Sequence, residues 1–295
     1  MHIKEYGERM HNEFKLPKGI SVHIKEVAGQ LGIMGEDEFI TSELSGPASY
    51  LLRHPGKMMR PALVFFGAEF IGEEDLGKYV GLAASIELLH TSSLIHDDMI
   101  DKDMRRRGRE SVHARYGMEG AVLAGDALIS KAIEMAVPYG NAVVSRISSS
   151  AMSMCAGEMM DYSFQKKGRT PSLAEYLRMA ELKSSVLIGT SVSIAALHSS
   201  DGIFEQAYKA GIMLGTAFQV RDDILDFRKD SGGDHARPNA VTSIARERGK
   251  GTEDAIAEAI KLNNKYVSGA TEIFEMKRGS MLSRYAKEVA VDPGS

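Results

Sequence analysis

Two aspartate clusters carry the chemistry that this sequence offers. The chain reads Leu-Ile-His-Asp-Asp-Met-Ile-Asp at 94–101 and Gln-Val-Arg-Asp-Asp-Ile-Leu-Asp at 219–226. In a helix, residues four apart lie almost above one another. Asp97 therefore points the same way as Asp101, with Asp98 on the flank. The second cluster repeats this arrangement with the residues Asp222, Asp223 and Asp226.

Three carboxylates in one small patch predict a bound cation. They repel one another and destabilise a helix unless positive charge neutralises them. Mg²⁺ suits such ligands, because it binds one or two carboxylates together with waters and substrate phosphates. Two such helix faces opposed across a cavity would hold a cluster of Mg²⁺ ions around a diphosphate.

Two other interpretations of the acidic patches compete with a metal site. An acidic patch can be an ordinary solvated helix face, but these patches lie in apolar helices, beside Ile95 and Ile224. An EF-hand loop starting at Asp101 fails, because Arg105 and Arg106 occupy positions that need a ligand and a glycine. The presence of both motifs therefore favours metal sites.

Cationic side chains lie near the first motif. Arginines dominate the segment Arg105–Arg109, and their guanidinium groups match phosphate oxygens bidentately. A basic surface loop, or salt bridges back to the aspartates, would explain the same residues. Upstream, Lys57 and Arg60 follow a glycine and form a second candidate anion site.

Two further residues are candidates only in combination with the motifs. His90 precedes Asp97 by two helical turns and so lies on the same helix face. Lys183 falls inside an apolar helical segment, where a lysine usually extends its ammonium group to the surface. Each signal by itself fits an ordinary structural role.

Helices must position these residues, because helical periodicity dominates from about Ile40 onward. The clearest helical segments are Tyr79–Ile100, Ala121–Val137, Ser172–Leu197 and Gln206–Phe227. Ser172, with Glu175 three residues later, predicts a capping box. Loops are expected at Arg105–Gly117, Gln165–Pro171 and Lys229–Asn239. We expect a single all-α domain over residues 1–295.

Composition narrows the class of protein. The 295 residues carry a net charge of -4, which argues against a general nucleic-acid binder. The lone Cys155 cannot form an intrachain disulfide, so a reducing cytoplasm fits best. The first residues do not read as a signal peptide, and no apolar run approaches the ~18 residues that span a bilayer. We expect a cytoplasmic protein without a transmembrane segment or a nucleic-acid partner.

Taken in order, these residues resemble the trans-isoprenyl diphosphate synthase (polyprenyl synthetase) family, of the geranylgeranyl or longer-chain type. The resemblance covers about residues 49–226. Its matching segments are Gly56–Pro61, Glu87–Asp101, Arg106–Gly108, Val112–Gly117, Leu123–Leu128, Glu175–Ser185 and Phe218–Asp226. The resemblance implies an isoprenoid synthase fold, with long antiparallel helices around a deep central cavity, and a homodimer.

The resemblance also implies residue roles. Three Mg²⁺ ions would bind with the allylic diphosphate, and their ligands would be Asp97, Asp98, Asp101, Asp222, Asp223 and Asp226. The flanking Asp98 and Asp223, and also Asp226, would either ligate or orient. The allylic diphosphate would contact Arg106, Lys183 and Gln219. Isopentenyl diphosphate would contact Lys57, Arg60, His90 and Arg107. Catalysis would rest on Asp97, Asp101, Lys183, Ser184, Gln219 and Asp222, and Ser184 with Gln219 would stabilise the nascent cation.

The sequence departs from the family pattern at three places. Met58 replaces a basic residue, and Glu158 replaces the glutamine of a Gly-Gln-x-x-Asp segment. Ala236 stands where a lysine is expected after the second motif. We expect Lys229 or Arg237 to supply the missing cation.

The implied reaction is head-to-tail condensation of isopentenyl diphosphate with an allylic prenyl diphosphate, by ionisation, condensation and elimination. The growing chain would run in a tunnel along the helix that ends in Asp97–Asp101. A large aromatic residue four or five positions before Asp97 would then stop growth at short products. Ser93 and Ser92 occupy those positions, with Ser85 two turns further back. Products of C20 or longer are therefore expected.

Three alternatives share parts of this pattern. A terpene cyclase of the same fold normally changes the second metal motif, and a head-to-head synthase has different aspartate spacings. A non-catalytic or weakly active partner subunit of a heteromeric synthase would be expected to have lost one motif. This chain keeps both motifs, and only its altered segment after Asp226 leaves the partner-subunit reading open.

Overall fold

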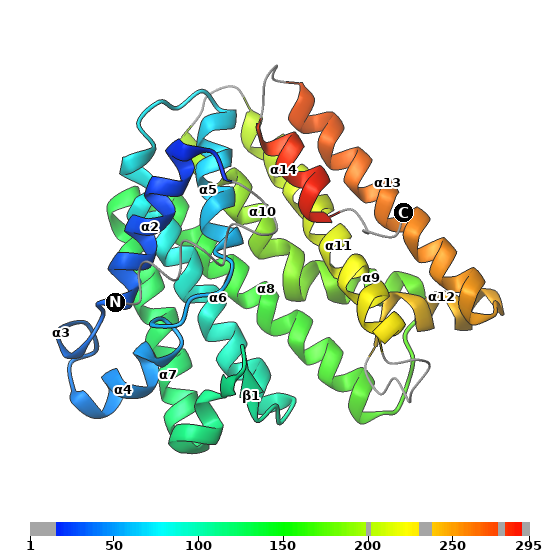
Figure 1. Cartoon of the computed structure of the whole chain (residues 1–295), viewed down its shortest axis with the longest axis horizontal. Helices are drawn as coiled ribbons and strands as arrows, with labels where there is room; N and C mark the ends of the chain where they lie inside the picture. The colour runs from blue at the N-terminus through cyan, green and yellow to red at the C-terminus, as the bar shows by residue number, and fades with distance from the viewer. Residues whose placement is uncertain (1–15, 199–201, 230–237, 277–280, 291–295) are drawn as a thin grey trace. The chain divides into compact units, whose positions relative to one another are not determined.

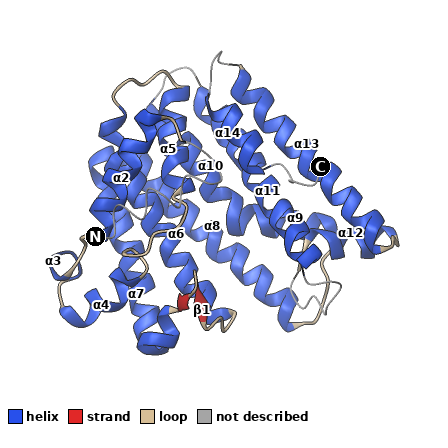
Figure 2. Cartoon of the chain, viewed as in Figure 1, coloured by secondary structure: helices blue, strands red, loops and turns tan. Residues whose placement is uncertain are grey.

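The computed structural model describes residues 16–198, 202–229, 238–276 and 281–290. These residues are almost entirely helical, with one small hairpin, which confirms the all-α prediction (Figures 1 and 2). The chain divides into two compact units, residues 1–151 and 152–295. The expectation of one domain over the whole chain stays a prediction.

The first unit is built around the helix that ends in the first aspartate motif. Its elements are α2 (Lys18–Gly32), α3 (Glu36–Phe39), α4 (Ser42–Tyr50), α5 (Met59–Phe70), η2 (Leu76–Tyr79), α6 (Val80–Ile100), β1 (Arg105–Arg106), β2 (Arg109–Glu110), α7 (Val112–Ala136) and η3 (Val137–Tyr139). Helix α8 (Asn141–Lys166) begins here and continues into the second unit.

Helix α6 is apolar on nearly all sides, as a central helix should be. It packs along α7, where small residues allow a close approach. The Ser85 hydroxyl donates to the carbonyl of Ala132 at 2.6 Å, and the Ser92 hydroxyl donates to the carbonyl of Gly125 at 2.9 Å. These contacts fix how α6 is rotated, and so fix where its aspartates point.

The loop expected at residues 105–117 is partly wrong. Its first half is a hairpin in which β1 pairs antiparallel with β2. The turn residues Arg107 and Gly108 have φ angles of 53° and 77°, the two positive values of a type I′ turn. Its second half is helical, because α7 already starts at Val112, with a kink at Gly117 where φ is 81°.

The second unit carries the other aspartate motif. Its elements are α9 (Leu173–Ala180), the π-helical turn η4 (Glu181–Ser185), α10 (Val186–Ser193), η5 (Ile194–His198), α11 (Ile203–Lys229), α12 (Ala240–Arg248), α13 (Thr252–Glu275) and α14 (Met281–Ala290). A buried cluster that includes Tyr176, Ile224 and Ile244 joins α9, α11 and α12. The capping box at Ser172 is confirmed, with Glu175 accepting from the Ser172 amide at 2.9 Å.

The predicted helix at 172–197 follows a helical path but is interrupted by η4. A π-helical turn widens the helix by one residue and often occurs at functional sites. Gly157 on α8 makes room for it, because a Cβ there would lie 2.2 Å from the backbone nitrogen of Lys183. The backbone that carries Lys183 is therefore pressed against α8.

One described stretch, Leu173–Leu197, has the length and apolar composition of a membrane span. In the structure 72% of its most apolar window is buried within the protein. The core helix of a soluble protein passes the same test, so this stretch is weak support for a membrane span. The expected absence of a transmembrane segment stays a prediction.

Candidate active site

The first motif stands in the last turn of α6. Asp97 and Asp98 lie near the helix end at Ile100, and Asp101 is the C-terminal cap. Negative charge is unfavourable there, because the exposed carbonyl groups already make a helix C-terminus negative, at a typical cost of about 0.3–1 kcal/mol per charge. Asp97 and Asp101 are half-buried, whereas Asp98 is fully buried. The local fold thus gathers negative charge that a cation would stabilise.

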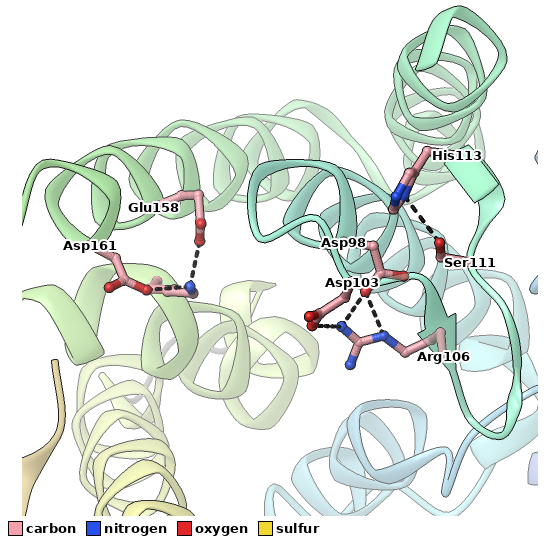
Figure 3. A network of polar contacts seen from close by, with 8 residues as sticks. Asp98, Asp103, Arg106, Ser111, His113, Glu158 and Asp161 are labelled. Atoms are coloured by element: carbon pink, nitrogen blue, oxygen red, sulfur yellow. Dashed lines mark hydrogen bonds and ion pairs between the residues drawn. The ribbon is translucent and has the colours of Figure 1, made fainter. Parts of the chain in front are cut away.

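Asp98 binds an arginine of the hairpin. Its Oδ1 accepts from Arg106 Nε at 2.8 Å and also from Arg106 Nη2, while Asp103 lies 3.9 Å from the same guanidinium group (Figure 3). Burial raises the pKa of Asp98, and the hydrogen bond and charge of Arg106 oppose that rise. Its Oδ2 is buried without a hydrogen-bond partner. For Arg106, the alternative of a salt bridge back to the aspartates is therefore correct in this structure.

Arg60 and His90, two predicted isopentenyl diphosphate contacts, meet in the first unit. The Nη1 atom of Arg60 lies 2.9 Å from Nε2 of His90. Burial lowers the pKa of His90 well below its usual range, and the charges of Arg60 and Arg107 lower it further. The imidazole is therefore neutral, so Nε2 accepts the hydrogen bond and holds the guanidinium group in place.

Arg107 covers the loop that carries Lys57. Its Nη1 donates to the carbonyl of His54 at 2.9 Å. A Cβ on Gly56 would lie 2.5 Å from Arg107 Nη2, so the glycine is required for this approach. Met58, at the position where a basic residue was expected, is buried with a φ of 52° and begins α5. Lys57 remains exposed beside these groups.

Glu87 is a functional candidate that sequence reasoning missed. It lies one turn before His90 on α6 and is almost completely buried. Burial raises the pKa of Glu87 to about 7, although the charges of Arg60 and Arg107 oppose the rise. The available signal was an isolated acidic residue inside the apolar part of a helix.

The second motif occupies the last two turns of α11. Asp222 and Asp226 are exposed and stand one turn apart on the same face. Arg221 Nη1 lies 3.4 Å from Asp222 Oδ1. The outer two carboxylates of this motif are therefore accessible to a cation.

Asp223, the central residue of that motif, is committed to protein donors. Its Oδ2 accepts from the Tyr176 hydroxyl at 2.6 Å and the Ala240 amide at 2.7 Å, and its Oδ1 accepts from Gln219 Nε2 at 3.0 Å. Burial raises the pKa of Asp223 to about 6, against the opposing effect of these three hydrogen bonds. The Ser184 hydroxyl donates to Gln219 Oε1 at 3.1 Å. This network supports the orienting role for Asp223 and brings Ser184 and Gln219 together.

Lys183 lies between two carboxylates of α8. Its Nζ is 2.6 Å from Asp161 Oδ2 and 2.7 Å from Glu158 Oε2 (Figure 3). All three side chains are largely buried. Lys183 is therefore not the surface lysine that its helical position alone would favour, and its two acidic partners were not paired with it from the sequence.

The donor set fits Mg²⁺. Among the described residues, no three acidic, histidine or cysteine side chains converge closely enough to hold a metal ion by themselves. Each motif instead offers a pair of carboxylates one turn apart, half-buried for Asp97 and Asp101 and exposed for Asp222 and Asp226. Mg²⁺ is commonly bound in this way, with one or two carboxylates and the remaining positions filled by water and phosphate.

Some predictions are left without a structural test. The two motifs lie in different units, so their opposition across a cavity stays a prediction. Ala236 and Arg237 fall outside the described residues, as does the side chain of Lys229.

Ser85 and Ser92 are buried against α7, so they do not line the tunnel predicted along α6. Ser93 is half-buried, and its hydroxyl donates to the carbonyl of His90 in the same helix.

The chain is similar in sequence to known proteins of one family. The family model described as polyprenyl synthetase matches residues 41–254, which include both aspartate motifs. A geranylgeranyl pyrophosphate synthase of Geoglobus acetivorans is 38% identical over 201 residues, 63% of this chain and 62% of that protein. A short chain isoprenyl diphosphate synthase of Methanothermobacter thermautotrophicus is 33% identical over 274 residues, 83% of this chain and 79% of that protein.

The fold of this chain is also similar to that of solved structures. The structure of the geranylgeranyl pyrophosphate synthetase from Geoglobus acetivorans superposes with a TM-score of 0.80 and 28% identity, and covers 92% of this chain and 97% of that one. The sequence alignment to the Geoglobus protein spans less than two thirds of that relative's length. The family model nevertheless matches well over half of this chain, and the chain therefore belongs to the polyprenyl synthetase family.

Proposed function

We propose that this protein is a prenyltransferase that condenses isopentenyl diphosphate head to tail with an allylic prenyl diphosphate. The products are a linear trans-polyprenyl diphosphate of C20 or longer and free diphosphate. One observation carries the proposal: both Asp-Asp-x-x-Asp motifs, each with an accessible pair of carboxylates, lie inside the segment that matches the family.

The allylic substrate would be held by residues of both motifs and by nearby cations. Bound Mg²⁺ would supply Lewis-acid stabilisation of the diphosphate as negative charge develops on it. Arg106, Lys183 and Gln219 would bind and orient the same diphosphate. As the allylic C–O bond breaks, Ser184 and Gln219 would place oxygen dipoles toward the positive charge left on the allyl group.

The second substrate would be held in the first unit. Lys57, Arg60, His90 and Arg107 would bind the diphosphate of isopentenyl diphosphate. Its double bond attacks the allylic cation and forms the new C–C bond, and a proton then leaves to the released diphosphate. The neutral His90 would fix Arg60 for this contact without adding charge of its own.

The activity is tested with purified protein, labelled isopentenyl diphosphate, an allylic primer and Mg²⁺, followed by chromatography of the dephosphorylated products. Asp97→Ala or Asp222→Ala should slow turnover at least ~10²-fold, as loss of one electrostatic stabiliser does, and EDTA should abolish it. Asp254→Ala, an exposed position in the first turn of α13, is the matched control. Near-normal turnover in Asp97→Ala, or activity in EDTA, would refute the proposal.

The two substrates can be separated kinetically. Lys57→Ala or Arg60→Ala should raise the KM for isopentenyl diphosphate more than the KM for the primer, and Lys183→Ala should do the reverse. Equal effects of all three changes on both substrates would contradict the assignment of residues while leaving the reaction class intact.

Product length is tested at Ser93. Its side chain is half-buried and bonds only within its own helix among the contacts described, so Ser93→Phe can fill space beside α6 without displacing α7. We expect this variant to release shorter products than the wild type. A native product limited to C15, or an unchanged product in the variant, would contradict the tunnel prediction.

We also propose that the protein acts as a cytoplasmic homodimer. Helix α7 exposes Met118, Val122 and Leu123 within six residues, and exposed apolar side chains near one another are of the kind that subunit contacts cover. Light scattering coupled to size exclusion should give twice the chain mass, and Leu123→Glu should lower it. A monomeric wild type would overturn the homodimer.

A further inference from the structure

Lys183 lies between the carboxylates of Asp161 and Glu158, but of these two only Asp161 accepts a hydrogen bond from it. Asp161 makes a directed hydrogen bond, since Lys183 Nζ donates to its Oδ2 at 2.6 Å, and Gln165 Nε2 donates to its Oδ1 at 3.2 Å. Glu158 Oε2 also lies 2.7 Å from Nζ, but as an ion pair without hydrogen-bond geometry. The two oxygens of Glu158 are buried and make no hydrogen bond.

Glu158 is held beside Lys183 by the backbone. Its neighbour Gly157 lies so close to η4 that a Cβ would be 2.2 Å from the Lys183 nitrogen and 2.6 Å from its Cα. The backbones of α8 and η4 are therefore in direct contact beside this ion pair. The ammonium group stays within reach of both carboxylates, whose side chains are only 11% and 10% exposed.

With a formal charge of −1 on each acid and +1 on the lysine, the three side chains sum to one net negative charge in a largely buried place. Burying a carboxylate that receives no hydrogen bond costs free energy, so Glu158 does not improve this packing. Its effect is electrostatic, because it partly cancels the field that Lys183 would present to an anion. Any anion that binds at Lys183 is therefore attracted less strongly than it would be without Glu158.

We propose that Glu158 weakens the binding of a diphosphate group at Lys183 and so speeds the release of free diphosphate after the reaction. This inference rests on the proposed function, in which Lys183 contacts the allylic diphosphate. Removing one unit charge a few ångströms from a bound anion should tighten binding by at least about tenfold, even where water screens most of the interaction.

Binding of inorganic diphosphate in the presence of Mg²⁺, measured by isothermal titration calorimetry, tests the proposal. Glu158→Gln keeps the side-chain shape and the Asp161 bond but removes the charge, and should lower the Kd at least about tenfold. Glu205→Gln, an exposed position 17 residues before Asp222 and so about 26 Å along α11, makes the same change in net charge and should leave the Kd within about twofold. Slower release of diphosphate should accompany the tighter binding.

A double-mutant cycle assigns the effect to Lys183. In the Lys183→Ala background the diphosphate is no longer drawn next to Glu158, so the gain from Glu158→Gln should be clearly smaller than in the wild type. A general change in the packing of α8 would give the same gain in both backgrounds. Glu158→Met, of similar length and also uncharged, repeats the test if the glutamine variant does not fold.

The outcomes distinguish this inference from the proposed function. If the wild type transfers prenyl groups but Glu158→Gln binds diphosphate equally or more weakly, the inference is overturned and the reaction stands. A gain of the same size in the Lys183→Ala background also overturns it. If the wild type neither reacts nor binds diphosphate, the proposed function and this inference fall together.

Discussion

Glu87→Gln should make the protein more stable above neutral pH. Glu87 is buried in the middle of α6, and burial raises its pKa from an ordinary 4.5 to about 7. Between these two values the folded protein keeps a proton that the unfolded chain has already lost. The contribution of Glu87 to the free energy of unfolding therefore falls as the pH rises from about 4.5 to about 7.

The size of the effect follows from the pKa. At about 1.4 kcal/mol for each pKa unit, the rise from 4.5 to about 7 corresponds to about 3 kcal/mol. Glutamine has the same shape and no proton to lose, so its contribution does not change with pH. We expect Glu87→Gln to match the wild type near pH 4 and to exceed it by about 3 kcal/mol at pH 8.

The assay is urea denaturation of both proteins from pH 4 to pH 8, followed by circular dichroism. Other titrating groups cancel in the difference between the two proteins, which isolates Glu87. Glu74→Gln, at an exposed position after α5, is the control, because substitutions at exposed positions usually change stability by no more than about 0.5 kcal/mol. A Glu87→Gln difference that changes by less than about 1 kcal/mol over this range would refute the argument from burial.

Three other substitutions test the packing around the site. Gly157→Ala should destabilise the second unit by about 1–3 kcal/mol, because its Cβ meets the Lys183 backbone at 2.2 Å; an unchanged urea midpoint would contradict this. Tyr176→Phe removes a donor from buried Asp223 and should cost about 1–3 kcal/mol in the same assay, with a neutral result as the contrary outcome. Ser92→Phe should lower the thermal midpoint by disrupting the contact with α7, and a normal midpoint with a shortened product would restore Ser92 to the tunnel.

The local pattern of the sequence determined which residues share a helix face. The periodicity around Asp97 and Asp222 predicted helices α6 and α11, and the capping box at Ser172 was read from two residue types three positions apart. Such features depend on neighbours within one or two turns, so a single sequence contains them. The hairpin at 105–110 was missed because its turn, Arg107 and Gly108, lacks the usual Asn-Gly or Asp-Gly signature.

Which groups the side chains on each helix face contact was decided only by the tertiary structure. Sequence spacing puts Asp98 beside Asp97, but packing buries Asp98 against Arg106 and leaves Asp97 partly exposed. The same holds for Ser92, which the spacing placed in a tunnel and the rotation of α6 directs to α7. Lys183 lies beside two carboxylates that are more than twenty residues away in sequence, because the backbones of α8 and η4 are in direct contact. Local periodicity sets the direction of a side chain relative to its own helix, whereas its partner is set by long-range packing that no short window of sequence records.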